Sequence, residues 1–409
     1  MRVLVLSWEY PPVVEGGLAR HVRKLSESLV ALGAEVHVLT RGNASQRGGS
    51  LVQGELEELR AGVFVHRVCE SPRPRDLNRF VAWVEHMNAD MLAAGVELGD
   101  RVEPDLVAGH DWLVAGAGEH LADRFRCPLV MTIHATEYGR HQGWVADHPQ
   151  SWIHGIERRI VHRADRVITC SHYMRDHVAD VFALPEDRIT VIPNGIDPMD
   201  LQPVEDLRAL RSRFAREEEK LVLLVGRLVY EKGFQLALEA LAPIVRRVSG
   251  VRFLVAGSGT YEEELREQAE SLGLTDHGMF LGWIGDDVLH SLYRIADLCV
   301  VPSIYEPFGL VALEAMASGC PCIVADTGGL REVVPSGERV GLRFNGGDAD
   351  HLGVMIERLL TDAPLRDRLV VEASEHVLAF DWGDVARQTL TLYGELLPDA
   401  VAPHAPSAL

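Results

Sequence analysis

Short apolar runs alternate with longer segments of helical spacing through the first half of the chain. Residues 2–7 and 35–39 are apolar enough for buried strands, and residues 18–32 between them carry apolar side chains at helical spacing that ends at Gly33. Further strands are expected at 105–108, 129–133, 166–170 and 190–192. Short apolar strands separated by helices predict a parallel α/β sheet with both faces covered.

The same alternation restarts near residue 220. A strand at 220–225 precedes a helix at 233–247, and a strand at 252–256 precedes a helix at 260–272. The remaining expected strands are 298–302 and 321–325. The two halves are not close sequence repeats, so the restart predicts two similar Rossmann-like domains rather than a solenoid.

The boundary between the domains is expected in the turn-rich segment Pro193–Pro198. We therefore predict a first domain over residues 1–195 and a second over residues 196–380. A last helix near 381–397 is a candidate to pack back on the first domain. The Ala- and Pro-rich tail, residues 398–409, predicts disorder.

The composition is that of a folded, acidic protein. The 409 residues are 47% hydrophobic and the formal net charge is −20, so the overall field repels nucleic acid and anionic membranes. A phosphate ligand must then be met by local cations and backbone amides. No apolar run is long enough for a membrane span or a signal peptide, so a cytoplasmic protein is expected. Six cysteines fit neither a disulfide framework nor a zinc site and are expected to be core thiols: Cys69, Cys127, Cys170, Cys299, Cys320 and Cys322.

Two glycine-containing loops follow predicted strands and are candidates to bind phosphate. Gly16 and Gly17 stand between the first strand and its helix, where amides and a helix N-terminus favour an anion, although a plain tight turn uses the same residues. In the second domain Arg227 and Lys232 share one loop after a strand. Two solvated cations are the alternative, but in an acidic protein a diphosphate clamp is the better interpretation. Gly257 closes the next strand and is expected in the same crevice.

The segment from Glu306 to Glu314 is the most specific. Gly309 marks the expected start of a helix, so the amides of residues 309–311 are available as donors. Glu306 and Glu314 have mostly apolar neighbours, where an unpaired carboxylate is costly, and sugar and ribose hydroxyls would satisfy both. Ordinary acids at a helix terminus are the alternative, which explains Glu306 better than Glu314.

Two histidines, His110 and His134, each follow a predicted strand of the first domain. The carboxyl ends of strands form the ligand-binding edge of an open sheet. A lone histidine is more often structural, but two at equivalent strand ends favour a functional role. The candidate acceptor-binding residues in this region are His134, Glu137, Tyr138 and Arg140, with Tyr138 and Trp144 as surfaces for a sugar ring.

Residues 152–166 mix tryptophan and isoleucine with several arginines. This composition is compatible with a basic amphipathic helix on a membrane. The solvated face of a domain helix is the commoner explanation, so membrane association is not expected.

These motifs together resemble the retaining GT-B glycosyltransferases of family 4, whose mark is two glutamates eight positions apart, here Glu306 and Glu314. Within the family the chain is similar to the actinobacterial glycogen-synthase-like α-glucan glucosyltransferases. The other matching motifs are Trp8–Pro12, Gly16–Leu18, His110–Leu113, Thr132–His141, Pro193–Asp197, Gly226–Leu228 and Lys232–Gly233. The resemblance covers Met1 to about Leu397 and implies two Rossmann-like domains facing across a cleft.

The resemblance implies a role for each matched residue. Arg227 and Lys232 would hold the diphosphate, Glu306 the donor sugar and Glu314 the ribose, while His110 would face the donor sugar from the other domain. The remaining contacts it implies are diphosphate or acceptor at Gly16 and Gly17, base at the backbone of Trp283 and Ile284, and sugar and phosphate at the amides after Phe308, which include Gly309 and Leu310.

The expected activity is glucosyl transfer, with retention of configuration, from ADP- or UDP-glucose to an α-glucan or maltooligosaccharide. No metal or other cofactor is expected, because cations and helix amides can neutralise the diphosphate. The closest approaches to a metal-binding Asp-x-Asp motif, Asp286-Asp287 and Asp348-Ala349-Asp350, are expected in solvent-facing loops. Val14 stands where the Lys-x-Gly-Gly-Leu loop of glycogen synthases has lysine, so their donor preference does not carry over.

Three alternatives remain. The first is a mannosyl- or other hexosyltransferase of the same fold with a lipid or small-molecule acceptor. The second is a hydrolase that uses Glu306 and Glu314 as paired carboxylates, although a hydrolase has no use for phosphate loops. The third is a nucleotide-sugar sensor without catalysis, against which the full set of site residues argues.

Overall fold

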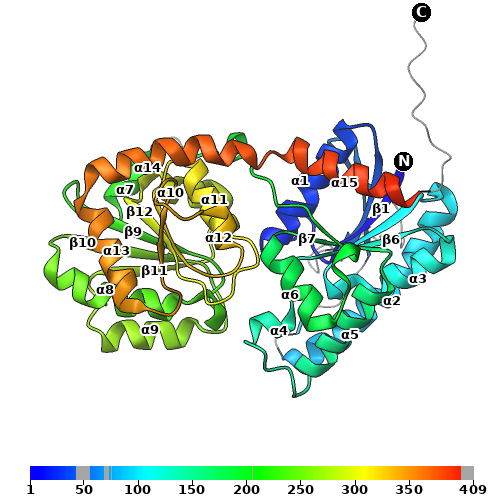
Figure 1. The fold of residues 1–409 in the computed structure, drawn as a ribbon, viewed down its shortest axis with the longest axis horizontal. Coiled ribbons are helices and arrows are strands. Elements are labelled where there is room, and N and C mark those ends of the chain that lie inside the picture. Colours follow the sequence, from blue (N-terminus) through cyan, green and yellow to red (C-terminus); the bar gives the residue numbers. More distant parts are fainter. Residues whose placement is uncertain (43–55, 69–72, 75, 205, 398–409) are drawn as a thin grey trace, which may run out of the picture. The chain divides into compact units, whose positions relative to one another are not determined.

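The computed structural model describes residues 1–42, 56–68, 73–74, 76–204 and 206–397. The chain forms two compact units, one of Met1–Pro193 together with the chain from Trp382 onward, and one of Asn194–Asp381. Each unit is built around its own sheet (Figure 1). The division falls inside the segment in which the linker was expected, and the cleft between the domains stays a prediction.

In the described residues the first unit contains an eight-stranded sheet in the order β3-β4-β2-β1-β5-β6-β7-β8. Its strands are β1 (Arg2–Leu6), β2 (Glu35–Arg41), β3 (Leu56–Arg60), β4 (Val63–Val68), β5 (Leu106–His110), β6 (Leu129–Ile133), β7 (Arg166–Thr169) and β8 (Ile189–Val191). All neighbouring strands are parallel except β3, which is antiparallel to β4. Central strands such as β5 are buried along their length, which explains their continuous apolar runs. The pair β3 and β4 was not predicted, because polar residues interrupt both segments.

The helices of the first unit cover this sheet. They are α1 (Gly17–Ala31), α2 (Leu77–Val102), α3 (Ala115–Phe125), α4 (Glu137–Arg140), α5 (Gln150–Arg163), α6 (His172–Phe182) and α15 (Trp382–Leu396). The helix α15 lies beside α1, and Trp382, Val385 and Tyr393 share a buried cluster with Val22 and Leu29 of α1 (Figure 1). The last helix of the chain is therefore part of the first unit's core.

The second unit contains a six-stranded, fully parallel sheet in the order β11-β10-β9-β12-β13-β14. Its strands are β9 (Lys220–Val225), β10 (Val251–Ala256), β11 (Gly278–Gly282), β12 (Leu298–Val301), β13 (Cys322–Ala325) and β14 (Leu342–Phe344). Its helices are α7 (Leu207–Ser212), α8 (Phe234–Arg247), α9 (Glu262–Ser271), α10 (Asp286–Ile295), α11 (Leu310–Ala317), α12 (Leu330–Val333), α13 (Ala349–Thr361) and α14 (Ala363–His376). Both units are thus Rossmann-like, as predicted, with helices between successive parallel strands.

The segment considered as a membrane-surface helix is α5. Its side chains at Ile153, Glu157, Ile160 and Val161 are buried, and the helix packs against α3, α4 and β6. The membrane alternative for this segment is therefore wrong, because its apolar residues belong to the core of the first unit. No helix among the residues described is long and apolar enough to span a membrane.

Two further expectations need correction. Cys127 is only half-buried, whereas the prediction of core thiols holds for the four buried cysteines, and Cys69 lies outside the described residues. Asp286, Asp287 and Asp350 are exposed and Asp348 is half-buried. They lie at the starts of α10 and α13, where Asp348 caps α13 by accepting a hydrogen bond from the His351 amide. Acids are favourable there because of the helix dipole. The predicted disordered tail also lies outside the described residues.

Candidate functional site

The predicted donor-site residues of the second unit lie at one edge of its sheet. Because the strands are parallel, the loops that follow β9, β10, β11 and β12 all leave at the same edge, and these strands are neighbours. The loops carry the predicted residues Arg227 and Lys232, then Gly257, then Trp283 and Ile284, then Glu306, Phe308 and Gly309, and the last loop leads into α11, which carries Leu310 and Glu314. The fold therefore gathers every donor-site residue predicted in this unit.

A cation and a carboxylate pair directly at this edge. The Lys232 ammonium donates a hydrogen bond of 2.8 Å to Oε2 of Glu306, and the Ser303 hydroxyl donates one of 3.0 Å to the same oxygen. The Lys232 side chain keeps 20% of its surface exposed. Glu306 is buried, but its charge is not left unpaired, because it has polar partners from two loops. The sequence did not point to Ser303.

The second predicted carboxylate also has a polar partner. Glu314 lies in α11 and accepts a hydrogen bond of 3.0 Å from the hydroxyl of Tyr293, a fully buried residue of α10. This buried carboxylate is therefore also paired within the protein. A buried tyrosine needs a partner for its hydroxyl, so Tyr293 could have been noticed, but its partner could not.

The helix α11 starts at this edge and presents backbone donors. Gly309 caps it with φ +119°, a conformation that favours glycine, and the first N–H groups of a helix have no acceptor within the helix. The loop after β13 packs closely here, since a Cβ on Gly329 would lie 2.2 Å from the Pro307 carbonyl oxygen. The Gly329 amide also donates to the Glu306 carbonyl, at 2.9 Å. This supporting loop was not predicted.

The other predicted residues of this unit are more open. The Arg227 side chain is 48% exposed, with a guanidinium nitrogen 3.9 Å from a carboxylate oxygen of Glu231, and Trp283 is 71% exposed. Gly257 has φ +141°, and a Cβ there would lie 1.8 Å from the Gly226 carbonyl oxygen. Glycine is therefore required where the loops after β9 and β10 meet.

In the first unit the two predicted histidines are hydrogen-bonded to each other. His110 is the last residue of β5 rather than following the strand, and His134 comes directly after the neighbouring β6. Nδ1 of His110 lies 3.0 Å from Nε2 of His134. Burial, and then the neighbouring His134 and His21, hold the pKa of His110 well below its usual range, and burial lowers the pKa of His134 to about 4. Both rings are therefore neutral at pH 7.

The third ring at this edge was missed by the sequence analysis. His21, a buried residue of α1, has its ring centroid 5.5 Å from that of His110 and 4.7 Å from that of His134. It lies five positions after Gly16, in the first turns of a helix that follows a predicted phosphate loop. The sequence signal that could have identified His21 was its position on the buried face of α1.

The glycine loop before α1 is held by a buried acid. Gly16 caps α1, Gly17 is its first residue, and Oε2 of Glu9 accepts hydrogen bonds from the amides of Glu15 (2.5 Å) and Gly16 (3.2 Å). Burial raises the pKa of Glu9 to about 7, although the two amides oppose this shift. The Gly16 amide expected to meet a phosphate or acceptor thus already has a partner inside the protein.

Two arginines meet the acid next to that glycine. Glu15 accepts hydrogen bonds from Arg41 at 2.7 Å and from Arg73 at 2.5 Å. Burial opposes the effect, but these guanidinium groups hold the pKa of Glu15 below its usual range. Both guanidinium groups also lie over the Trp8 ring. The loop therefore carries an anion of its own between two cations.

The predicted acceptor segment contains the short helix α4. Thr136 caps it by accepting a hydrogen bond from the Gly139 amide, and the Glu137 amide donates to both carboxylate oxygens of Glu157, at 2.9 and 3.2 Å. Burial raises the pKa of Glu157 to about 8. Tyr138 is 38% exposed, whereas Glu137 is buried. The remaining predicted residue, Arg140, is half-buried.

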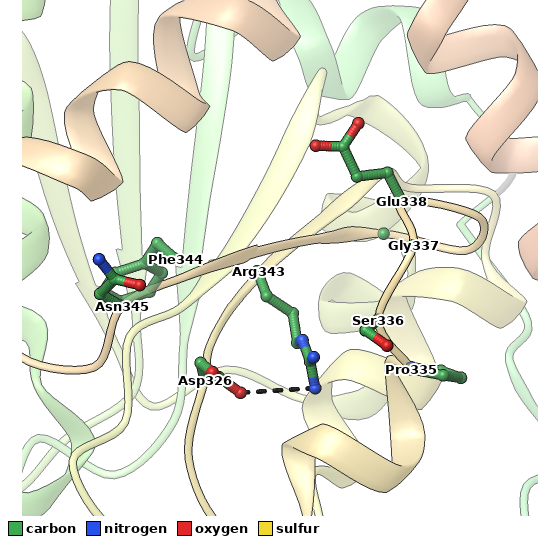
Figure 2. Close-up of a pocket in the computed structure, with 9 residues that line it drawn as sticks. Asp326, Pro335, Ser336, Gly337, Glu338, Arg343, Phe344 and Asn345 are labelled. Atoms are coloured by element: carbon green, nitrogen blue, oxygen red, sulfur yellow. Dashed lines mark ion pairs between the residues drawn. The ribbon is translucent and has the colours of Figure 1, made fainter.

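A separate polar pocket lies beside β14 in the second unit (Figure 2). Its volume is about 240 Å³, and Arg343 projects into it with Nη1 3.4 Å from Oδ1 of Asp326. Asp326 also pairs with Arg331, at 2.9 Å. None of the predicted site residues lines this pocket.

Comparison with known proteins supplies relatives over the whole chain. The family described as Glycosyl transferases group 1 matches residues 208–376, and the one described as Glycosyltransferase Family 4 matches residues 15–199. A glycogen synthase of Mycobacterium tuberculosis is 37% identical, covering 100% of this chain and 99% of the relative. A D-inositol 3-phosphate glycosyltransferase of Nocardia farcinica is 30% identical, covering 97% and 90%. The structure of sucrose-phosphate synthase from Thermosynechococcus elongatus matches with a TM-score of 0.81 and 28% identity, covering 97% and 98%.

Proposed function

Because the chain belongs to the group 1 glycosyltransferases, enzymes of GT-B fold, we propose that it moves a glucosyl unit from ADP- or UDP-glucose to an α-glucan or maltooligosaccharide, with retention of configuration. Similarity to a glycogen synthase over the full length of both chains supports the glucosyl donor and the glucan acceptor. Family membership excludes the hydrolase and the sensor that the sequence had left as alternatives. We also propose that the enzyme is a retaining member of family 4 and that it is cytoplasmic.

The observation that carries the mechanism is the pair of Lys232 and Glu306 beside the N-terminus of α11. A nucleotide diphosphate leaves with negative charge, which a nearby ammonium group and helix amides stabilise. Arg227, half-exposed on the same loop, supplies a second cation. We assign Lys232 and Arg227 to the leaving diphosphate.

The two carboxylates, Glu306 and Glu314, would bind hydroxyl groups of the donor. Glu306 would contact the donor sugar while Lys232 offsets its charge, and Glu314, oriented by Tyr293, would accept hydrogen bonds from the ribose. The backbone near Trp283 would contact the base. In the transfer, the bond between sugar C1 and the diphosphate oxygen breaks, an acceptor oxygen bonds to C1 on the same face, and the acceptor proton passes to the departing diphosphate. No metal is needed for these steps.

The first unit supplies neutral groups to the sugars. His110 and His134 are uncharged at pH 7 and can only donate or accept hydrogen bonds, which suits hydroxyl groups better than phosphate. In the acceptor segment, exposed Tyr138 offers a face on which a glucose ring can stack. The roles proposed for Glu137 and Arg140 are secondary, because the structure keeps both partly or fully buried.

A second candidate is transfer to a small phosphorylated acceptor. The relative from Nocardia farcinica is named for D-inositol 3-phosphate, and Arg41 and Arg73 meet at Glu15 beside the glycine loop, where a phosphate could replace the carboxylate. Two guanidinium groups on one anion are a common means of phosphate binding.

A donor and acceptor matrix distinguishes these candidates. ADP-, UDP- and GDP-glucose and GDP-mannose are each offered with maltooligosaccharide, glucose phosphates, inositol 3-phosphate and a lipid acceptor, and nucleotide release and product length are measured. Chain extension from ADP- or UDP-glucose with a new α-linkage supports the proposal. Release only with a phosphorylated acceptor establishes the second candidate, and release only with GDP-mannose or with lipid refutes the glucan assignment.

A further inference from the structure

Three imidazole rings converge at the carboxyl edge of the first unit's sheet. His21 comes from α1, His110 ends β5 and His134 follows β6. One ring nitrogen from each residue lies within 4.8 Å of the other two, and Nδ1 of His110 lies 3.0 Å from Nε2 of His134. Because the three side chains come from separate elements packed in one unit, the backbone holds the cluster together.

This spacing is close to that of a metal site. A tetrahedral Zn²⁺ ion with Zn–N bonds of about 2.0–2.1 Å holds its ligand nitrogens about 3.3 Å apart. The hydrogen-bonded nitrogens of His110 and His134 already approach this separation, and one of the two rings must shift its proton to its other nitrogen before both can bind an ion. Imidazole nitrogen also suits Zn²⁺, Cu²⁺ and Ni²⁺, whereas Mg²⁺ prefers oxygen ligands.

The surroundings favour binding of moderate strength. His21 and His110 are buried, while His134 is partly exposed and gives an ion a path to the cluster. The nearby Asp111 carboxylate accepts a hydrogen bond from the His134 backbone amide at 2.7 Å, which helps to fix the position of His134.

We propose that His21, His110 and His134 form a binding site for one divalent transition-metal ion of the Zn²⁺ type, and that its occupancy inhibits glycosyl transfer. The inhibition rests on the proposed function, because the ion would occupy the nitrogens with which His110 and His134 face the sugars. The metal binding does not rest on it. The ion has no part in the chemical step, so its removal leaves activity unchanged or raises it, whereas removal of a catalytic metal abolishes activity.

The test measures metal binding directly. Chelator-treated protein is titrated with Co²⁺, whose visible absorption intensifies in a tetrahedral nitrogen site, and Zn²⁺ is then used as a competitor. One equivalent of Co²⁺, displaced by Zn²⁺, is expected for the wild type. His21→Gln should weaken binding at least tenfold.

The chain offers a matched control in the same unit. His37 and His66 are also hydrogen-bonded histidines on neighbouring strands, with Nδ1 of His37 3.1 Å from Nε2 of His66, but the other His37 nitrogen meets Glu35 on the opposite side of the ring. His37→Gln should therefore leave the Co²⁺ titration unchanged. Because either variant could fold poorly, thermal unfolding is followed with and without Zn²⁺, and only His37→Gln should retain the Zn²⁺-dependent rise in Tm.

The outcomes separate the parts of the proposal. Absence of Co²⁺ binding by the wild type, or equal binding by His21→Gln, overturns the site. Binding without loss of turnover at saturating Zn²⁺ overturns the inhibition. If the wild type transfers sugar from none of the donors, the proposed function fails, but the Co²⁺ titration still decides whether the site exists.

Discussion

The carboxyl edges of the two sheets use opposite kinds of chemistry on closely related frameworks. In the second unit Lys232 and Arg227 keep part of their charge exposed, beside the start of a helix. In the first unit the central groups are neutral imidazoles, and the acid of the glycine loop, Glu9, binds backbone amides within the protein. Under the proposed function, this difference corresponds to a division of roles, in which one edge would meet a charged leaving group and the other would meet sugar hydroxyls.

Removing a cation from the carboxyl edge of the second unit's sheet should have the largest effect on turnover. Lys232→Ala and Arg227→Ala should each lower kcat about 10- to 100-fold, because each removes a charge-assisted contact of about 1.5–3 kcal/mol to the leaving diphosphate. Steady-state kinetics with the best donor measures this loss. Lys220→Ala is the control, since Lys220 starts β9 at the opposite edge of the same sheet. Near-normal rates in both Lys232→Ala and Arg227→Ala would refute this division of roles between the two edges.

A smaller effect should follow loss of the hydroxyl that orients Glu314. Tyr293→Phe removes one hydrogen bond, worth about 1 kcal/mol, and should raise the KM of the nucleotide-sugar about fivefold. A donor that lacks the ribose hydroxyls should be affected less, because Glu314 has nothing to bind there. Tyr393→Phe, which removes the hydroxyl of another buried tyrosine, in α15 of the first unit, serves as the control. Equal effects on both donors would mean that Tyr293 has only a structural role.

The strand ends could be predicted from the sequence, but the partners of the site residues could not. Continuous apolar runs such as β5 and β9 mark their own ends, so the end of β9 before the Lys232 loop was located correctly and the end of β5 was placed two residues too early, before His110. The helix start at Gly309 and the apolar neighbours of Glu306 and Glu314 pointed to the carboxylates, and the family resemblance then supplied their roles. The pairing of Lys232 with Glu306 joins loops 74 positions apart, and it depends on the sheet order that places β9 beside β12.

The buried acid Glu157 shows the same limit of prediction from the sequence. Glu157 lies between Ile153 and Ile160 on one face of α5, and an acid at an apolar helical position should have suggested a buried partner. The arginines of the same helix indicated an exposed face instead. Its partner, the Glu137 amide, comes from a different element and follows only from the packing of α4 against α5.

The buried acid of the first unit should leave a pH signature on stability. The pKa of Glu157, about 8, lies above its ordinary value of 4.5, so the folded protein binds more protons than the unfolded chain between these values. Stability from this group is therefore complete below about pH 4.5 and declines as pH rises toward 8. Each unit of pKa shift corresponds to about 1.4 kcal/mol, or roughly 3–6 °C in Tm for a domain of this size.

Glu157→Gln tests this signature, because it removes the titrating group and keeps one acceptor for the Glu137 amide. The Tm of the wild type, measured by calorimetry, should fall relative to that of the variant as the pH rises from 5 to 8. Glu119→Gln, on the neighbouring helix α3, should follow the wild type. Parallel Tm curves for wild type and Glu157→Gln would show that the Glu157 carboxyl does not titrate in this range.

Removal of metal ions by a chelator should have the smallest effect on the rate of transfer. Whether the rate rises or falls distinguishes the carboxyl edge of the first unit's sheet from that of the second. If cations of the second edge neutralise the diphosphate, EDTA should not lower the rate, since Lys232 supplies there the charge that Mg²⁺ supplies in other transferases. The acids closest to a metal-binding motif lie at helix starts, where Asp348 is committed to an N-cap. If Zn²⁺ occupies the histidines of the first edge, EDTA should raise the rate in the wild type and have no effect in His21→Gln. Assays before and after chelation, followed by addition of Zn²⁺ or Mg²⁺ in slight excess over the chelator, separate these effects. A loss of activity in EDTA that Mg²⁺ restores would assign the charge neutralisation to a metal and overturn the role proposed for Lys232.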